Sequence, residues 1–137
     1  MGETLRDQII RHEGIRLKMY KDSLGIETLG VGHNLRDKPI SNKAAMVILD
    51  DDIQDATDEL RKELPWVDNL DWPRRAVLIN MSFNLGIHGL LGFKNTLSLI
   101  EQGRYLEAST AMILSKWSQQ VGARAFELAE IMRTGEM

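Results

Sequence analysis

The sequence predicts an α+β fold that is mostly helical, with its few strands near the start of the chain. Two observations predict this class. Apolar residues recur at helical spacing over most of the 137 residues, whereas an alternation of apolar and polar residues is confined to positions 16–31. No segment repeats and no flexible linker interrupts the helices, so we expect one compact domain, large enough to bury a hydrophobic core.

The first predicted element is a short amphipathic helix over residues 3–13. Leu5 and Ile9 recur at helical spacing, and Gly14 stands where a helix commonly ends. A further step of four residues from Ile9 leads to Glu13, which places this carboxyl on the apolar face in the last turn. The negative end of the helix dipole and partial burial both disfavour ionisation, so we expect a protonated Glu13 that can donate its proton.

The next segment, residues 16–31, predicts a modest β-hairpin. Apolar and charged residues alternate on both sides of Asp22-Ser23-Leu24-Gly25, which has the composition of a turn. Asp22 opens this turn, where solvent and backbone N–H groups favour a charged carboxylate. Thr28 follows six residues later, so the hairpin would bring its hydroxyl toward Asp22, with a water molecule held between them.

Helices are predicted over the rest of the chain, because apolar residues recur there at helical spacing between glycine and proline stops. The longest is capped by Ser41 or Asn42 and runs to about residue 64. The next helix starts at Asp71 and stops at Gly86. The remaining helices are shorter and are expected over about 95–102, 105–115 and 124–133.

The charge distribution argues against a nucleic-acid-binding protein. The net charge is −3, and residues 37–71 carry −6, whereas residues 1–36 carry +1 and 72–137 carry +2. A nucleic-acid footprint needs lysines and arginines clustered on one face. No apolar run approaches the roughly 20 residues of a membrane span, so stable membrane insertion is not expected. The chain has no cysteine, and its three histidines lack zinc-ligand spacing, so no metal is expected.

Two carboxyl groups in different surroundings, Glu13 and Asp22, fit the needs of glycoside hydrolysis. That reaction uses one acid to protonate the leaving oxygen, while a second group serves the anomeric carbon. Surface carboxylates are common, so spacing alone also allows an ordinary solvated pair. The expected place of Glu13 on an apolar face favours the catalytic interpretation for that residue.

The stretch from Glu13 to His33 closely resembles the T4-like phage lysozymes of glycoside hydrolase family 24, in residue types and in the spacing of its Glu, Asp, Thr, Gly-x-Gly and His. The resemblance implies a lysozyme-like fold with a small lobe over about 14–40, a linking helix over about 41–64, and a helical lobe over about 66–137 joined by helix 3–13. It covers most of the chain, because it continues in the segments 74–86, 92–97, 116–117 and 133–135.

The resemblance implies hydrolysis of the β-1,4 bond between N-acetylmuramic acid and N-acetylglucosamine in bacterial peptidoglycan, without a metal or organic cofactor. By the same resemblance Glu13 is the general acid. Asp22 and Thr28 position the attacking water or stabilise the developing cation, consistent with inversion at the anomeric carbon. Inversion needs about 6.5–9.5 Å between the two functional groups, which leaves room for the water.

Supporting roles are also implied by the resemblance. Arg124 matches an arginine that pairs with the catalytic glutamate, which would oppose the effect of burial on that acid. His33 and Asp52 match an ion pair between the small lobe and the long helix, and we prefer a structural role for this histidine. Three residues match substrate-cleft positions, Phe83, Thr96 and Asn34, the last with a residue type that differs from the family pattern.

Two features leave other functions open. The connection between His33 and the long helix is shorter than in longer members of the family, and the net acidity opposes electrostatic steering toward an anionic wall. A wall-binding homologue with weak or no activity is therefore an alternative to an active endolysin. A lytic transglycosylase that leaves an anhydro end is a third possibility, which the presence of Asp22 and Thr28 disfavours.

The expected partner of the protein is the glycan strand of peptidoglycan, and a monomer is expected. The start of the chain has no apolar signal region, so we expect synthesis in the bacterial host cytoplasm. Action on the cell wall would then follow permeabilisation of the membrane by a holin or an equivalent protein.

Overall fold

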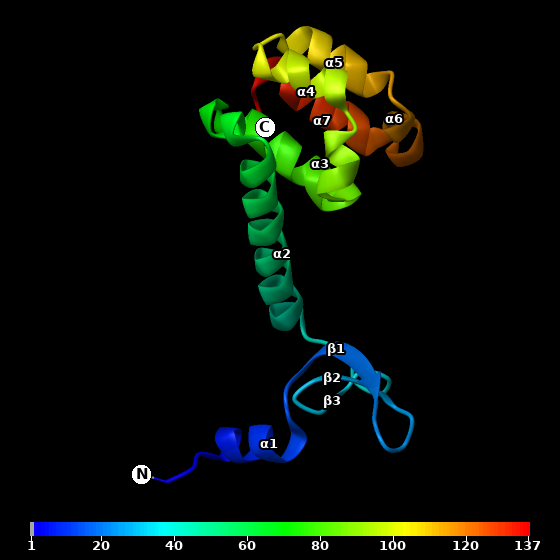
Figure 1. Cartoon of the computed structure of the whole chain (residues 1–137). Coiled ribbons are helices and arrows are strands. Elements are labelled where there is room, and N and C mark those ends of the chain that lie inside the picture. The colour runs from blue at the N-terminus through cyan, green and yellow to red at the C-terminus, as the bar shows by residue number, and fades with distance from the viewer. Residues whose placement is uncertain (1) are drawn as a thin grey trace. The chain divides into compact units, whose positions relative to one another are not determined.

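The computed structural model of the chain describes residues 2–137, which form a mostly helical α+β fold (Figure 1). The predicted fold class is confirmed, because seven α-helices and one three-stranded antiparallel sheet are present within these residues. The chain divides into two compact units, Met1–Ile48 and Leu49–Met137. The sheet lies wholly in the first unit, and the helices α3 to α7 lie wholly in the second.

The first unit begins with α1 (Leu5–Glu13), close to the predicted helix over residues 3–13. The Thr4 hydroxyl caps this helix by accepting a hydrogen bond from the Asp7 N–H at 3.0 Å. Gly14 ends the helix with φ +73°, a left-handed value that glycine adopts without a steric penalty. Both ends of α1 therefore follow from local sequence.

The apolar face of α1, which the sequence predicts to be buried, is not covered by other residues of the first unit. Leu5 is 71% exposed, Ile9 is 43% exposed, and none of the residues of the helix is buried. Glu13 is exposed as well. Helical spacing identifies a face of a helix, but it carries no information about the surface that covers that face. The expected packing of this helix with the helical lobe stays a prediction.

One ion pair ties the start of the chain to α1. The Arg11 guanidinium donates two hydrogen bonds to the Glu3 carboxylate, at 2.8 Å from Nε and 2.9 Å from Nη2. These bonds hold the pKa of Glu3 below its ordinary value. Both side chains are well exposed, so the pair contributes little to the stability of the fold.

The sheet follows α1 and has the order β1-β2-β3. The predicted hairpin is confirmed as β1 (Arg16–Lys21) and β2 (Glu27–Gly30), which pair in antiparallel fashion. A two-residue strand, β3 (His33–Asn34), pairs with the other edge of β2 and was not expected from the sequence. Thr28 faces Tyr20 on one side and Asn34 on the other, which leaves it only 3% exposed.

The long predicted helix is α2 (Asn42–Glu63), which contributes residues to both units. Ser41 is its cap, since the Ser41 hydroxyl accepts a hydrogen bond from the Ala44 N–H at 3.1 Å. Of the apolar stripe that predicts this helix, only Leu60 is buried, and Ile53 is 41% exposed. The spacing therefore locates the helix correctly but overstates how much of it is covered.

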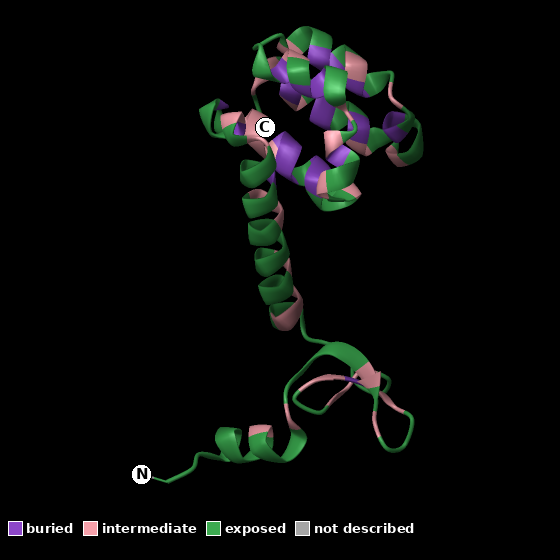
Figure 2. Cartoon of the chain, in the orientation of Figure 1, coloured by how far each residue is buried: buried purple, intermediate pink, exposed green. Residues whose placement is uncertain are grey.

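The hydrophobic core lies in the second unit. Figure 2 shows the buried residues gathered in its helices, whereas α1 and most of α2 are exposed. The largest fully buried side chains come from the end of α2, the connection that follows it and the helices α3, α4, α5 and α7. The core is enclosed by a 3-10 helix (Pro65–Asn69), α3 (Trp72–Leu91), α4 (Lys94–Glu101), α5 (Tyr105–Ile113), α6 (Lys116–Val121) and α7 (Ala123–Thr134).

Two details of the second unit differ from the prediction or refine it. The predicted stop at Gly86 is a kink, because Gly86 has φ +76° inside α3 and separates two helical pieces. The segment between Ser115 and Gly122, expected as a break between helices, forms α6. Ser115 caps this short helix through its hydroxyl, and Trp117 anchors it in the core at 3% exposure.

Within residues 2–137, no single helix has both the length and the apolar composition that crossing a membrane requires. Taken together, α3 and α4 meet these two criteria, but they bend by 106° at their junction. Both helices contribute buried residues to the core.

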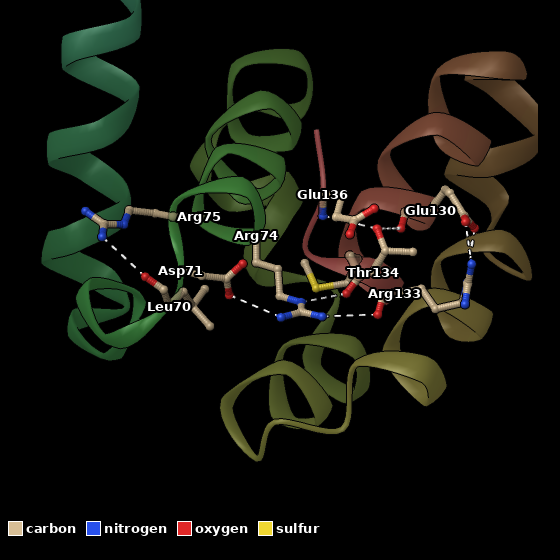
Figure 3. Close-up of polar contacts among 9 residues, drawn as sticks. Leu70, Asp71, Arg74, Arg75, Glu130, Arg133, Thr134 and Glu136 are labelled. Carbon is tan, nitrogen blue, oxygen red and sulfur yellow. Dashed lines mark hydrogen bonds and ion pairs between the residues drawn. The ribbon is translucent and has the colours of Figure 1, made fainter.

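Arg74 joins the start of α3 to the end of α7, as Figure 3 shows. Its guanidinium donates to the Met132 carbonyl at 2.8 Å and to the Arg133 carbonyl at 3.1 Å. It also pairs with Asp71 at 3.3 Å and lies 3.7 Å from the ring centre of Tyr105. The last carbonyl groups of a helix lack partners within the helix, so Arg74 acts as the cap of α7.

Candidate active site

The predicted general acid, Glu13, lies at the last position of α1, and its side chain lies where a side chain at position 32 would project. A Cβ atom at position 32 would come within 2.9 Å of Glu13 Oε2 and 3.1 Å of Glu13 Cδ. Gly32 also has φ +68°, a value that other residues rarely adopt. The φ value therefore favours glycine at this position, and a side chain there would displace the end of the Glu13 side chain.

The predicted second acid, Asp22, organises the turn between β1 and β2. Its Oδ1 atom accepts hydrogen bonds from the Leu24 N–H at 2.8 Å and the Ile26 N–H at 3.0 Å. Its own N–H donates to the Ile26 carbonyl at 2.9 Å, and its carbonyl accepts from the Gly25 N–H at 2.9 Å. Asp22 is half-buried, and one of its two carboxylate oxygens is fixed by the backbone.

Thr28 is linked to Asp22 through the carbonyl of Ile26. The Thr28 hydroxyl donates to this carbonyl at 2.8 Å, and the Asp22 N–H donates to the same oxygen at 2.9 Å. The strand register places Tyr20, rather than Asp22, directly opposite Thr28. The hairpin thus brings Asp22 and Thr28 to one end of the sheet, as expected. The Ile26 carbonyl that links them is not evident from the sequence.

His33 and Asn34 form the short strand β3 and are both half-buried. A ring nitrogen of His33, Nε2, lies 2.9 Å from the Lys38 carbonyl oxygen. The Asn34 amide donates to the Asp37 carboxylate at 2.8 Å and accepts from the Asp37 N–H at 3.1 Å. Both side chains therefore shape the connection that leads to α2, and the predicted sugar contact of Asn34 stays a prediction.

In the second unit, Arg124 is held by Asn80. The Asn80 Oδ1 atom accepts hydrogen bonds from Arg124 Nε at 3.0 Å and from Nη2 at 2.6 Å. Both residues line a cavity of about 470 Å³, together with Phe83, which is 45% exposed. Most of the remaining walls of this cavity are apolar, with Leu49, Ile53, Trp72, Ala76 and Ile79 among them.

The other predicted residues of the second unit occupy different surroundings. Asp52 is exposed on α2 and lines a separate cavity with Phe83. Thr96 lies in α4 and is only 6% exposed, and its predicted substrate contact stays a prediction. Trp117 is buried, and its ring N–H donates to Asn84 at 2.9 Å.

The structure thus gathers five of the predicted residues in the first unit and four in the second. Glu13, Asp22, Thr28, His33 and Asn34 belong to the first, whereas Arg124, Asp52, Phe83 and Thr96 belong to the second. The pairs of Arg124 with Glu13 and of His33 with Asp52 stay predictions.

Two positioning residues were missed by sequence reasoning. Gly32 belongs to the Gly-x-Gly pair of the family resemblance, to which the sequence analysis gives no role of its own, although a glycine following a strand is the signal that could have identified it. Asn80 gives no comparable signal, because it lies 44 residues from its partner Arg124.

The model of a family described as phage lysozyme matches residues 10–132. The chain is 28% identical over 167 aligned positions to probable T4-type lysozyme 1 of Dictyostelium discoideum, covering 100% of this chain and 98% of the relative. It is also 30% identical over 115 positions to the endolysin of Salmonella phage P22, covering 77% of this chain and 76% of that protein.

A third relative is much longer than this chain. The pre-baseplate central spike protein Gp5 of Enterobacteria phage T4 is 27% identical over 165 positions, which cover 100% of this chain but 28% of Gp5. The 167-position alignment with the Dictyostelium protein exceeds the 137 residues of the chain, so at least 30 of its positions have no counterpart here.

Proposed function

Because the chain belongs to the phage lysozyme family, whose members are lysozyme-type peptidoglycan hydrolases, we propose that it cleaves the β-1,4 bond between N-acetylmuramic acid and N-acetylglucosamine. The observation that supports this proposal best is the arrangement of the first unit. It presents Glu13 against Gly32, and it joins Asp22 and Thr28 through one backbone carbonyl.

Glu13 is the proposed general acid. A protonated carboxyl at this position would donate its proton to the glycosidic oxygen as the bond to the anomeric carbon breaks. The Glu13 carboxyl fills the space that a side chain at position 32 would take, so glycine at that position permits this placement. The placement of the carboxyl matters for catalysis, since an acid must be within hydrogen-bond reach of the leaving oxygen in the transition state.

Asp22 and Thr28 are the proposed anchors of the attacking water. The Thr28 hydroxyl has one proton, which it donates to the Ile26 carbonyl, so its oxygen remains available as an acceptor. The Asp22 carboxylate has a second oxygen besides the one fixed by the turn. A water that donates one proton to each of these acceptors keeps a lone pair free to attack the anomeric carbon on the face opposite the leaving group, which gives inversion.

We further propose that the protein acts as an endolysin and as a monomer. Its similarity to the P22 endolysin supports this role. In that case the protein would be made in the cytoplasm of a bacterial host and would reach the wall after a holin or an equivalent protein permeabilises the membrane. Expression of the chain in bacteria with and without such a protein tests this point, and lysis in both cases would contradict it.

The central experiment incubates purified protein with isolated peptidoglycan and identifies the released sugar ends. We expect new reducing ends with inverted anomeric configuration from the wild type, and a loss of at least about 100-fold for Glu13→Gln, which cannot donate the acid proton. Far-ultraviolet circular dichroism of both proteins verifies that the variant is folded.

Two other outcomes would identify the alternatives. Equal and negligible release by the wild type and Glu13→Gln, with retained binding to peptidoglycan, would show a wall-binding homologue. Anhydro ends would show a lytic transglycosylase. Either result would contradict the proposed hydrolysis.

A further inference from the structure

Tyr20 lies beside Thr28 in the sheet of the first unit. The register of β1 and β2 pairs Tyr20 with Thr28, and the register of β2 and β3 pairs Thr28 with Asn34. Side chains of directly opposite residues project from the same face of a sheet, with Cβ atoms about 4.5–5.5 Å apart. Tyr20, Thr28 and Asn34 therefore form a row across one face, with the proposed water anchor Thr28 in the middle.

Tyr20 differs from the rest of its strand in burial. The other residues of β1 are exposed, whereas Tyr20 is half-buried. The two other apolar side chains of the strand, Leu17 and Met19, are 88% and 62% exposed. The strand as a whole is therefore not covered, and the partial burial of Tyr20 comes from contacts of its own.

A β-bulge determines which residue of β1 faces Thr28. The pairs Arg16–Gly30 and Tyr20–Thr28 are four positions apart along β1 but two positions apart along β2, so β1 contains two extra residues between them. Without these residues, the register that starts at Arg16 would place Lys18 opposite Thr28. A lysine ammonium there could donate to the threonine oxygen and compete with a water. Bulges often redirect a side chain beside an active site, and this one puts an aromatic ring next to the Thr28 hydroxyl.

Arg16 restricts the movement of the Tyr20 ring. The central carbon of its guanidinium lies 4.7 Å from the centre of the ring, within the range of a cation–π interaction. Residues four apart in a regular strand are about 13 Å apart, so the bulge and the length of the arginine side chain together allow this contact. One face of the ring is thereby occupied by the guanidinium.

An aromatic neighbour favours one orientation of the Thr28 side chain. Threonine carries a methyl group and a hydroxyl on Cβ, and rotation about Cα–Cβ exchanges their places. A ring surface suits the methyl group, whereas a hydroxyl turned toward it would lose its acceptor at a site that is only 3% exposed. In the structure the hydroxyl donates to the Ile26 carbonyl at 2.8 Å, which leaves its oxygen free to accept from a water.

We infer that Tyr20 is a positioning residue, which keeps the Thr28 hydroxyl in the orientation that anchors the attacking water. The catalytic consequence of this inference rests on the proposed function, whereas the orientation of Thr28 can be measured without catalysis. The ring of Tyr20 carries out this role, so a phenylalanine at the same position retains it.

The first test measures the side-chain angle χ1 of Thr28 by NMR in the full chain labelled with ¹³C and ¹⁵N. Three-bond couplings from the Thr28 methyl carbon to its backbone nitrogen and carbonyl carbon report this angle. We expect the couplings of one rotamer in the wild type and in Tyr20→Phe, and averaged couplings in Tyr20→Leu. Tyr105→Leu is the matched control, because it removes the other tyrosine ring that lies against an arginine, Arg74 in the second unit. It should leave the couplings of Thr28 unchanged.

The second test measures kcat and KM for release of reducing ends from soluble, uncrosslinked glycan strands. Tyr20→Leu is expected to lower kcat about tenfold and to change KM less than about twofold, and Tyr20→Phe should restore most of the lost kcat. Tyr105→Leu should keep kcat within about twofold of the wild type. Thr28→Val lacks the hydroxyl, so Tyr20→Leu/Thr28→Val should lose no more activity than Thr28→Val alone. A ring that only stabilises the sheet would instead give the product of the two losses.

Circular dichroism verifies that each variant is folded. If Tyr20→Leu is unfolded, Arg16→Gln takes its place in both tests, since this substitution is exposed and keeps the ring but removes the cation that restricts it. We expect Arg16→Gln to average the Thr28 couplings in part and to lower kcat about threefold. Wild-type couplings and wild-type kcat in this variant would contradict the inference.

Several other results would overturn the inference. They are unchanged Thr28 couplings in folded Tyr20→Leu, a Tyr20→Phe that is as impaired as Tyr20→Leu, and multiplied losses in Tyr20→Leu/Thr28→Val. Release of sugar ends by the wild type together with any of these results overturns this inference alone. Averaged couplings in Tyr20→Leu, without any release by the wild type, would overturn the proposed hydrolysis and show that Tyr20 orients Thr28 for another purpose.

Discussion

The Glu13 carboxyl occupies the space into which a side chain at position 32 would project, although 19 positions separate the two residues in sequence. A Cβ atom there would lie 2.9 Å from Glu13 Oε2, 3.1 Å from Cδ and 3.2 Å from Cγ. The end of α1 and the turn after β2 therefore lie close together.

We predict that Gly32→Ala displaces the Glu13 carboxyl and lowers the rate of peptidoglycan hydrolysis about 100-fold, because a misplacement of about 1 Å has an effect of that order. The substitution also imposes a left-handed φ on alanine, which lowers the free energy of unfolding by about 1–2 kcal/mol. Gly30→Ala is the matched control. Gly30 has φ +71°, but a Cβ atom there meets no other atom within 4 Å.

The comparison of these two variants separates backbone strain from displacement of the acid. Denaturant unfolding should show similar losses of stability for both, whereas hydrolysis assays should show a much larger loss for Gly32→Ala. Equal activities of the two variants would contradict a positioning role for the contact.

The second prediction concerns the two functions of Asp22. Asn keeps an oxygen that can accept from the Leu24 and Ile26 N–H groups, so Asp22→Asn should fold and keep its turn. It should lose about 100-fold to 10,000-fold in hydrolysis, because the amide lacks the charge that orients and activates water. Near wild-type turnover of this variant would remove Asp22 from the mechanism.

Asp22→Ala provides the contrast for this prediction. It removes both backbone hydrogen bonds, so we expect a further loss of about 1–3 kcal/mol in the free energy of unfolding. Urea unfolding of both variants measures the difference, and equal stability would show that the turn does not depend on the carboxylate.

The third prediction concerns the Thr28 hydroxyl. Thr28→Val keeps the shape of the side chain but removes the hydrogen bond to the Ile26 carbonyl, which still accepts from the Asp22 N–H. We therefore expect a loss of only about 0.5–1.5 kcal/mol in unfolding free energy. Hydrolysis should fall about 100-fold, and Thr28→Ser should restore most of it. If serine fails to restore activity although its protein is folded, the hydroxyl is not the functional part of Thr28.

Much of the fold is predictable from the sequence because its elements end at residues with local signals. Thr4 and Ser41 cap helices through their own hydroxyls, and Gly14 and Gly86 break helical geometry with positive φ values. Such signals depend only on neighbouring backbone groups. They locate an element without describing what the element packs against.

The parts that sequence reasoning misses depend on distant contacts. The short helix α6 is too brief to show a periodic pattern, and it is anchored by Trp117, whose ring N–H binds Asn84 33 positions earlier. The exposure of Glu13 and its contact with Gly32 likewise depend on tertiary packing. The turn of Asp22 is predictable because it is local, whereas the carbonyl that Asp22 shares with Thr28 requires the three-dimensional hairpin.

The last prediction concerns stability and Arg74, which joins α3 to α7. Its side chain is 15% exposed and donates to two carbonyl groups at the end of α7, which no other helical N–H can satisfy. Arg74→Met keeps much of the length of the side chain but leaves these carbonyls without a donor, so we expect the free energy of unfolding to fall by about 2–4 kcal/mol. Arg74→Lys should recover only part of this loss, since one ammonium cannot reproduce the planar fork of the guanidinium over Tyr105.

Arg133→Gln is the control, because its ion pair with Glu130 is exposed and its loss should change stability by less than about 0.5 kcal/mol. Urea unfolding followed by tryptophan fluorescence measures all three, and a loss for Arg74→Met no greater than that for Arg133→Gln would show that the end of α7 is stable without this cap.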